Sequence, residues 1–209
     1  MSPLPRFDNL PEEKQHAILQ AAANEFAEHG YEGGSFNRII AAAGISKGAM
    51  YYYFADKADV YGAVLDHVLD RMAAVALAGE APRDAEGFWL AIAQGLERLN
   101  KSFFAEPQLA ALARGLYQGG GSDPATYRRL LARSADFVER VLARGQELGA
   151  VRDDLPRDLL VEAVTGLLVA VDRWFAEALA ERSYEELLPL APKVFELMLD
   201  LLEPRGATR

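Results

Sequence analysis

Helix-forming residues fill this sequence, and that pattern restricts the fold more than any other feature. Alanine and leucine dominate, β-branched residues are few, and strict alternation of apolar and polar residues does not persist. Apolar residues recur instead at helical spacing between glycine, proline and capping residues. We therefore expect an all-α fold of about nine helices. Without strands, a glycine-rich phosphate loop of the kind that follows a strand is excluded.

Capping and helix-breaking residues place four helices in the first part of the chain. They are expected at residues 11–29, 36–43, 47–53 and 57–78. Pro11 suits a first turn, and Gly30 ends the first helix, after which Tyr31 is expected to fold back onto it. The next three helices each follow a side chain that can cap a helix: Ser35, Ser46 and Asp56.

Longer helices are expected in the rest of the chain. They cover residues 84–105, 107–117, 124–149, 156–180 and 183–203. Asp123 followed by Pro124 is a strong start signal, and Ser183 with Glu186 forms a capping box that opens the last helix.

Composition narrows the class of protein. Hydrophobic residues make up 51% of the chain, which is ample for a packed core. The longest apolar runs, residues 73–78 and 167–171, are far shorter than the ~18 residues of a spanning helix, and the first residues lack a secretory signal. Cysteine is absent, and the three histidines have no metal-ligand spacing. We expect a cytoplasmic protein with no cofactor, metal or membrane partner.

The charge is distributed unevenly along the chain. The whole sequence carries a net charge of −9, which alone argues against binding nucleic acid. Residues 35–57, however, contain Arg38, Lys47 and Lys57 against Asp56 only. A small basic segment thus lies within an acidic protein, and local geometry has to decide what it binds.

The most informative segment runs from residue 35 to residue 54. A tight turn at residues 44–46 joins its two short helices, which need packing to hold them. Four apolar side chains are the expected buried positions: Ile39, Ile45, Met50 and Phe54. This spacing is typical of a helix-turn-helix, in which the second helix enters the major groove of DNA by its N-terminus.

The second short helix has the chemistry for that role. The Ser46 hydroxyl and the free amides beside it can face a phosphate. Gly48 allows the backbone to approach DNA closely, although it weakens the helix by ~1 kcal/mol relative to alanine. The hydroxyls of Tyr51, Tyr52 and Tyr53 can reach phosphates, and their ring edges can reach thymine methyl groups. The alternative for the tyrosines is ordinary packing.

This segment resembles the tetracycline-repressor (TetR) family of bacterial transcription regulators. The resemblance covers about residues 12–68 and is most specific in the run Ala43-Gly-Ile-Ser-Lys-Gly-Ala-Met-Tyr-Tyr-Tyr-Phe-Ala-Asp-Lys57. It implies a homodimer that binds double-stranded operator DNA through this segment. It also implies a helical C-terminal domain that binds a small effector and dimerises.

The resemblance extends to individual positions. It implies phosphate contacts from Tyr51 and Lys57, and base or groove contacts around Asn37, Lys47, Gly48, Ala49 and Tyr53. The full set of predicted DNA-binding residues is Ser35, Asn37, Arg38, Ser46, Lys47, Gly48, Ala49, Tyr51, Tyr52, Tyr53 and Lys57. For Arg38, pairing with a neighbouring acid is the alternative.

We expect two domains. Residues 10–56 form a three-helix DNA-binding domain with the helix-turn-helix, the helix at residues 56–78 connects, and residues 57–209 form the ligand-binding and dimerisation domain. The predicted effector pocket is lined by aromatic residues: Trp89, Phe103, Phe104, Tyr117, Tyr127, Phe137 and Trp174. Core packing is the alternative for any one of them.

The last two expected helices are apolar nearly all round, which indicates burial on more than one side. Two such helices from each subunit would make a four-helix interface. The predicted interface residues are Leu160, Leu167, Leu168, Val171, Phe195, Met198 and Leu202. A central buried helix in a monomer would account for residues 156–180 but not for both helices.

These observations predict a ligand-responsive DNA-binding regulator, a repressor that a small lipophilic effector releases from its operator. The alternative is a helical carrier or sensor of lipophilic molecules, which would not need the arrangement at residues 46–57. We do not expect an enzyme, because no general base or nucleophile stands out among the C-terminal residues.

Overall fold

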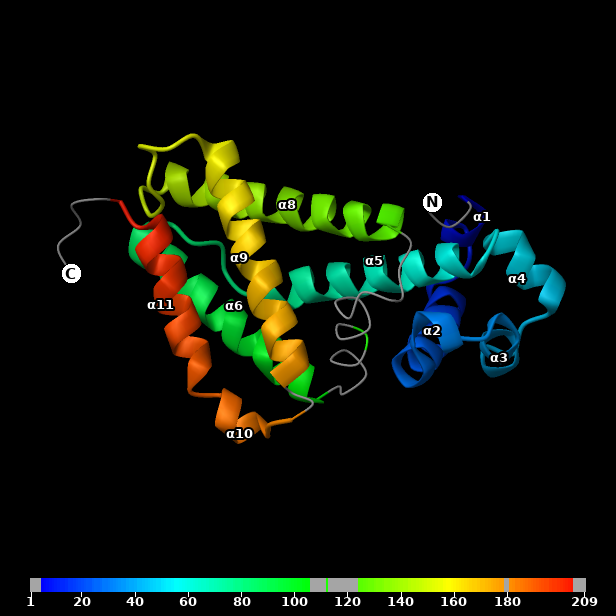
Figure 1. The fold of residues 1–209 in the computed structure, drawn as a ribbon. Helices are drawn as coiled ribbons and strands as arrows, with labels where there is room; N and C mark the ends of the chain where they lie inside the picture. The colour runs from blue at the N-terminus through cyan, green and yellow to red at the C-terminus, as the bar shows by residue number, and fades with distance from the viewer. Residues whose placement is uncertain (1–4, 106–111, 113–123, 179–180, 205–209) are drawn as a thin grey trace. The chain divides into compact units, whose positions relative to one another are not determined.

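A computed structural model describes residues 5–105, 112, 124–178 and 181–204. Every regular element within these residues is a helix, which confirms the expected all-α fold (Figure 1). None of the helices formed by the described residues is long and apolar enough to cross a membrane. The helices form two compact units. The first comprises the described residues of 1–71 and 106–130, and the second comprises those of 72–105 and 131–209.

The first unit is built from five helical segments. They are α1 (Pro5–Asp8), α2 (Glu12–Gly33), α3 (Phe36–Ala42), α4 (Lys47–Tyr53) and α5 (Lys57–Ala76), the last of which continues beyond the unit. Side chains from all five make its core, including Phe7 of α1, Ile18 and Phe26 of α2, Ile39 of α3, Met50 of α4 and Val60 of α5.

The sequence signals for the ends of these helices are confirmed. Gly30 has φ 67° and ψ 177°, which interrupts the helical backbone of α2 at the expected residue. The Tyr31 ring then lies back on Phe26, with ring centroids 6.2 Å apart. The Ser35 Oγ accepts the Arg38 amide at 3.4 Å, and the Asp56 Oδ1 accepts the Asp59 amide at 3.0 Å. Local side-chain capping therefore sets where these helices begin.

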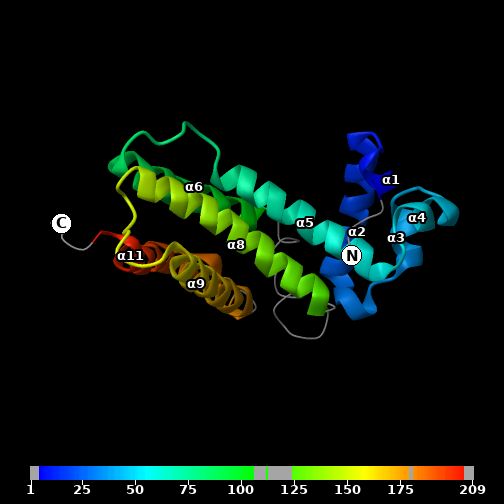
Figure 2. The ribbon, with the colours of Figure 1, turned by 90° about the horizontal axis from the view of Figure 1, so that it is seen from above.

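The second unit contains α6 (Ala85–Ala105), most of α8 (Pro124–Glu147), α9 (Arg157–Ala178), α10 (Tyr184–Leu187) and α11 (Leu190–Leu202). Helices α9 and α11 lie side by side in both views (Figure 2). The core of this unit includes Phe88, Val138, Leu142, Leu160 and Leu202.

Helix α8 ends as the sequence predicts. Gly149 has φ 67°, and the amides of Gly149 and Ala150 bond the carbonyls of Gln146 and Gly145. This is the double hydrogen bond of a Schellman motif, for which glycine is suited because it adopts positive φ without strain.

The expectation of one continuous last helix is wrong. The capping box forms, because the Ser183 amide donates to the Glu186 Oε2 at 2.8 Å and the Glu186 amide donates to the Ser183 Oγ at 3.4 Å. The chain then breaks at Pro189, and α11 begins after it. Proline lacks an amide hydrogen and its ring clashes with the preceding turn, so Pro189 is unsuited to the interior of one long helix. The helix expected at residues 107–117 lies outside the described residues.

Candidate DNA-binding site

The turn between α3 and α4 is held by backbone hydrogen bonds. Gly44 has φ 65°, and its amide bonds the Ala41 carbonyl at 3.3 Å, while the Ile45 amide bonds the Ile40 carbonyl at 3.3 Å. These bonds form a second Schellman motif. The turn is therefore short and ordered, and it fixes where α4 leaves α3.

Helix α4 starts at a capped residue and packs on one side only. The Ser46 Oγ accepts the Ala49 amide at 3.1 Å, as the sequence predicts. Met50, like Ile39 and Phe54, is fully buried, whereas Ile45 is only half-buried against the same core. The side chain of Met50 thus anchors the helix to the first unit, and the opposite face remains free.

The free face of α4 is exposed and lacks negative charge. It comprises Lys47, Gly48, Tyr51 and Tyr52, which are all exposed, and we call it the α4 face. The Tyr51 and Tyr52 side chains are 50% and 51% exposed, which is unusual for rings this large. No aspartate or glutamate occurs from residue 33 to residue 55. The α4 face is therefore able to receive an anionic partner.

The remaining predicted residues of α3 and α4 differ in exposure. Asn37 is exposed on α3, whereas Ala49 is half-buried. Tyr53 is half-buried and packs edge-on against Phe7, with ring centroids 6.2 Å apart. Tyr53 therefore belongs partly to the core, as the packing alternative allows.

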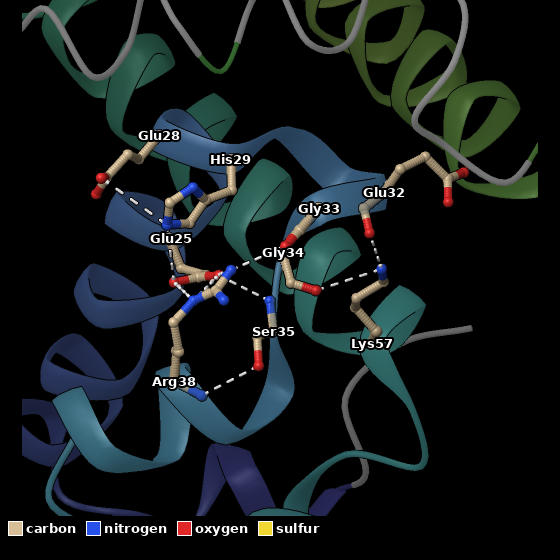
Figure 3. Close-up of polar contacts among 9 residues, drawn as sticks. All are labelled: Glu25, Glu28, His29, Glu32, Gly33, Gly34, Ser35, Arg38 and Lys57. Carbon is tan, nitrogen blue, oxygen red and sulfur yellow. Dashed lines mark hydrogen bonds and ion pairs between the residues drawn. The ribbon is translucent and has the colours of Figure 1, made fainter.

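Arg38 is bound within the protein. Its guanidinium donates to both carboxylate oxygens of Glu25, with a shortest distance of 2.6 Å from Nη2 to Oε1 (Figure 3). Nη2 also donates to the Gly33 carbonyl at 2.8 Å, and the Ser35 amide donates to the Glu25 Oε1 at 2.7 Å. Arg38 therefore pairs with a neighbouring acid, which was the alternative to DNA contact in the sequence analysis.

The Glu25–Arg38 pair ties α3 to α2. Glu25 is only 8% exposed, and its hydrogen bonds with Arg38 lower the pKa of its carboxyl, a shift that burial opposes. The sequence analysis did not single out Glu25. A signal was present, because an acid at a position of the α2 core stripe, seven residues after Ile18, requires a partner.

Lys57 also has partners inside the first unit. Its Nζ donates to the carbonyls of Glu32 at 3.1 Å and Gly34 at 3.4 Å, and lies 4.7 Å from the centre of the Tyr31 ring (Figure 3). The lysine therefore caps the carbonyl end of α2, where a positive charge is favourable.

The predicted effector residues do not form one group. Trp89 and Phe137 are half-buried in the second unit, and Trp89 packs against Phe88 and Phe195. Tyr127 belongs to the first unit. Trp174 is 43% exposed on α9. The remaining three side chains lie outside those that the structure describes: Phe103, Phe104 and Tyr117.

The predicted interface residues divide by burial. Three are buried within the chain itself: Leu160, Met198 and Leu202. The others are half-buried: Leu167, Leu168, Val171 and Phe195. A groove of about 290 Å³ lies between α9 and α11, lined by Ala170, Val171, Trp174, Phe175, Leu190, Lys193, Val194 and Leu197. Among the described residues, no cluster of side chains is suited to hold a metal ion.

Comparison with known proteins agrees with this geometry. Residues 18–64 match the family described as bacterial regulatory proteins, tetR family. Over 168 residues the chain is 32% identical to HTH-type transcriptional repressor SCO4008 of Streptomyces coelicolor, a match that covers 78% of this chain and 79% of that protein.

Solved structures share the fold. The SmeT–triclosan complex has a TM-score of 0.70 at 19% identity, covering 95% of each chain. FadR of Bacillus subtilis in complex with stearoyl-CoA has a TM-score of 0.64 at 20% identity, covering 88% of this chain and 96% of that chain. The matched segment and the repressor relative confirm the resemblance seen in the sequence, and the chain belongs to the TetR family of bacterial transcription regulators.

Proposed function

We propose that this regulator represses transcription by placing the α4 face in the major groove of operator DNA. The observation that carries the proposal is the α4 face itself: a capped helix start, two half-exposed tyrosines and a lysine, on a segment without acidic residues. A face of this kind offers hydrogen-bond donors to phosphates and ring edges to bases.

Gly48 has no structural need to be glycine. A Cβ built at this position meets only the Ser46 Oγ, at 3.9 Å, so the protein itself has room for a methyl group. We infer that close approach of DNA is the reason for a glycine in this exposed helix. Lys47 and Asn37, both exposed beside it, are proposed to contact base edges.

Arg38 and Lys57 are proposed to act mainly by positioning. Arg38 holds the start of α3 against α2 through Glu25, and Lys57 holds the end of α2 through its carbonyls. An ammonium has three N–H donors, so Lys57 keeps one for a phosphate while two bond the backbone. Removing either side chain would thus disturb binding through the fold as well as through charge.

Operator binding is proposed to need a homodimer formed through α9 and α11. Their apolar groove lies beside exposed large side chains, including Trp174 and Leu197 at 43% and 54% exposure. Exposed apolar side chains beside an apolar groove favour contact with another protein surface. A second copy of the chain would supply one and form a symmetric contact of four helices. The buried residues Leu160, Met198 and Leu202 would support this surface from beneath.

The effector is proposed to be a small apolar molecule bound by the second unit. That unit supplies half-buried aromatic rings at Trp89 and Phe137. The SmeT and FadR structures hold triclosan and stearoyl-CoA, which both have large apolar parts. An effector that binds one subunit arrangement better than the DNA-bound one releases the operator, and the operator weakens effector binding equally.

Selection from fragmented bacterial DNA, followed by fluorescence anisotropy, tests the main proposal. The purified protein should enrich a two-fold symmetric sequence and bind it at least about 1,000 times more tightly than random DNA of equal length. Equal affinity for both DNAs, or no binding, would overturn the proposal.

The effector proposal has its own test. A panel of apolar molecules should contain some that raise the melting temperature and release operator DNA over one concentration range. A charged polar metabolite that does both, while the apolar panel does neither, would contradict the proposal.

A further inference from the structure

The short helix α1 is fixed against the end of α4. Phe7 is 3% exposed, and its ring centroid lies 4.8 Å from that of Phe54 and 6.2 Å from that of Tyr53. The turn after α1 is held as well, since the Gln15 Nε2 donates to the carbonyls of Leu10 at 2.8 Å and Asp8 at 3.2 Å. A residue beside Phe7 is therefore held at a defined place next to α4.

Arg6 is that residue, and its side chain extends the α4 face. It is exposed, and its Cζ lies 4.5 Å from the centre of the Tyr52 ring, which is itself 51% exposed. No carboxylate among the described residues pairs with this guanidinium. A second cation has a related position, because the Lys47 Nζ lies 6.0 Å from the Tyr51 ring.

We propose that Arg6 is a further DNA-binding residue, which binds a backbone phosphate beside the groove that α4 enters, with the Tyr52 ring as its platform. This rests on the proposed role of the α4 face. A guanidinium stacked on a ring uses its flat face and leaves N–H donors at its edge, which fit a phosphate in pairs. A side chain already held on a ring also loses less freedom when it binds.

The competing explanation is that the Arg6–Tyr52 contact only packs α1 against α4. The two explanations differ in the salt dependence of DNA binding. Each phosphate neutralised by a protein cation makes the slope of log K against log salt steeper by about 0.9, whereas a packing contact leaves that slope unchanged.

The experiment compares Arg6→Ala, Arg6→Lys and Tyr52→Phe with the unaltered protein on operator and random DNA. Arg140→Ala is the matched control, because it removes one exposed arginine from α8 in the second unit. Arg6→Ala should weaken binding to both DNAs by the same factor, about threefold to tenfold, and reduce the slope by about 0.9 for each Arg6 in the complex.

The companion variants complete the pattern. Arg6→Lys should retain the slope, because the charge remains. Tyr52→Phe should also retain the slope, because the ring beneath Arg6 remains and the hydroxyl that it removes carries no charge, whatever that hydroxyl contributes to affinity. If Arg6→Ala leaves the slope unchanged, as Arg140→Ala does, Arg6 does not contact DNA, whether or not the melting temperature falls. Failure of the proposed function would be seen in the unaltered protein instead, which would then bind no operator in preference to random DNA.

Discussion

The α3–α4 segment of the first unit and the α9–α11 pair of the second treat their apolar side chains in opposite ways. In the first, Ile39, Met50 and Phe54 are completely buried, and no aliphatic side chain larger than alanine is exposed. In the second, Trp174 and Leu197 remain about half exposed beside an apolar groove.

This difference indicates which kind of partner each region can bind. The first region is completed by its own chain, so its exposed residues are available for a polar partner such as DNA. The second region has apolar surface that the described residues do not cover, and the proposed second copy of the chain would cover it. Substitutions on the two faces should therefore have separable effects.

The largest effect is expected from charge in the α9–α11 groove. Leu197→Asp should give soluble, folded monomers, because Leu197 is 54% exposed in the single chain. A symmetric interface contains the substitution twice, so a penalty of about 2 kcal/mol for each copy weakens association about 1,000-fold. Analytical ultracentrifugation measures the change, and operator affinity should fall with it.

Met198→Asp is the matched control. Met198 is only 8% exposed, so this charge should destabilise the fold of the single chain rather than dissociate a folded dimer. If Leu197→Asp remains a dimer, Leu197 of α11 is not part of the dimer interface.

A smaller effect is expected from the link between α2 and α3. Arg38→Ala leaves the Glu25 carboxylate buried without its main partner and should lower the free energy of unfolding by about 1–3 kcal/mol. Urea denaturation measures this loss. An equal free energy of unfolding in the variant would show that the pair contributes nothing to stability.

The same pair predicts a pH dependence. Because folding lowers the Glu25 pKa, the pair stabilises the protein above the pKa of an unfolded glutamate. That stability is lost as pH falls through the lower pKa of the folded state. The difference in stability between the unaltered protein and Glu25→Gln should therefore shrink in acid, and a constant difference would contradict the assignment.

The smallest effect is expected at Gly48. Gly48→Ala should raise the free energy of unfolding by about 0.5–1 kcal/mol, since the position is an exposed helical site with room for a methyl group. DNA affinity should fall about fivefold if the operator approaches closely. Gly34→Ala is the contrast: a Cβ at Gly34 would lie 2.8 Å from the Phe26 ring, so that variant should lose stability.

Sequence reasoning succeeded where the signal is local. Ser35, Ser46, Gly44 and Gly149 each act within about five residues, and the structure has their caps and turns as predicted. The prediction of one continuous last helix was wrong for a local reason too. It gave the apolar pattern more weight than Pro189, where the structure breaks the helix.

Contacts between distant residues were not predictable in the same way. Glu25 meets Arg38 thirteen residues later, and Lys57 meets carbonyls more than twenty residues earlier. The sequence shows that such charges need partners but not which ones they find, since the packing of α2 against α3 and α5 decides that. The faces of α9 and α11 were uncertain for a related reason, because helices that are apolar all round do not reveal which side turns inward.

The most direct test of the account measures DNA binding by Lys47→Glu. Lys47 is exposed at the start of α4, so the free energy of unfolding should change by less than about 0.5 kcal/mol. Operator affinity should fall at least about tenfold, with a shallower salt dependence, because a negative charge replaces a positive one at the phosphates. A folded Lys47→Glu protein that binds operator as tightly as the unaltered one would contradict the claim that α4 meets the DNA.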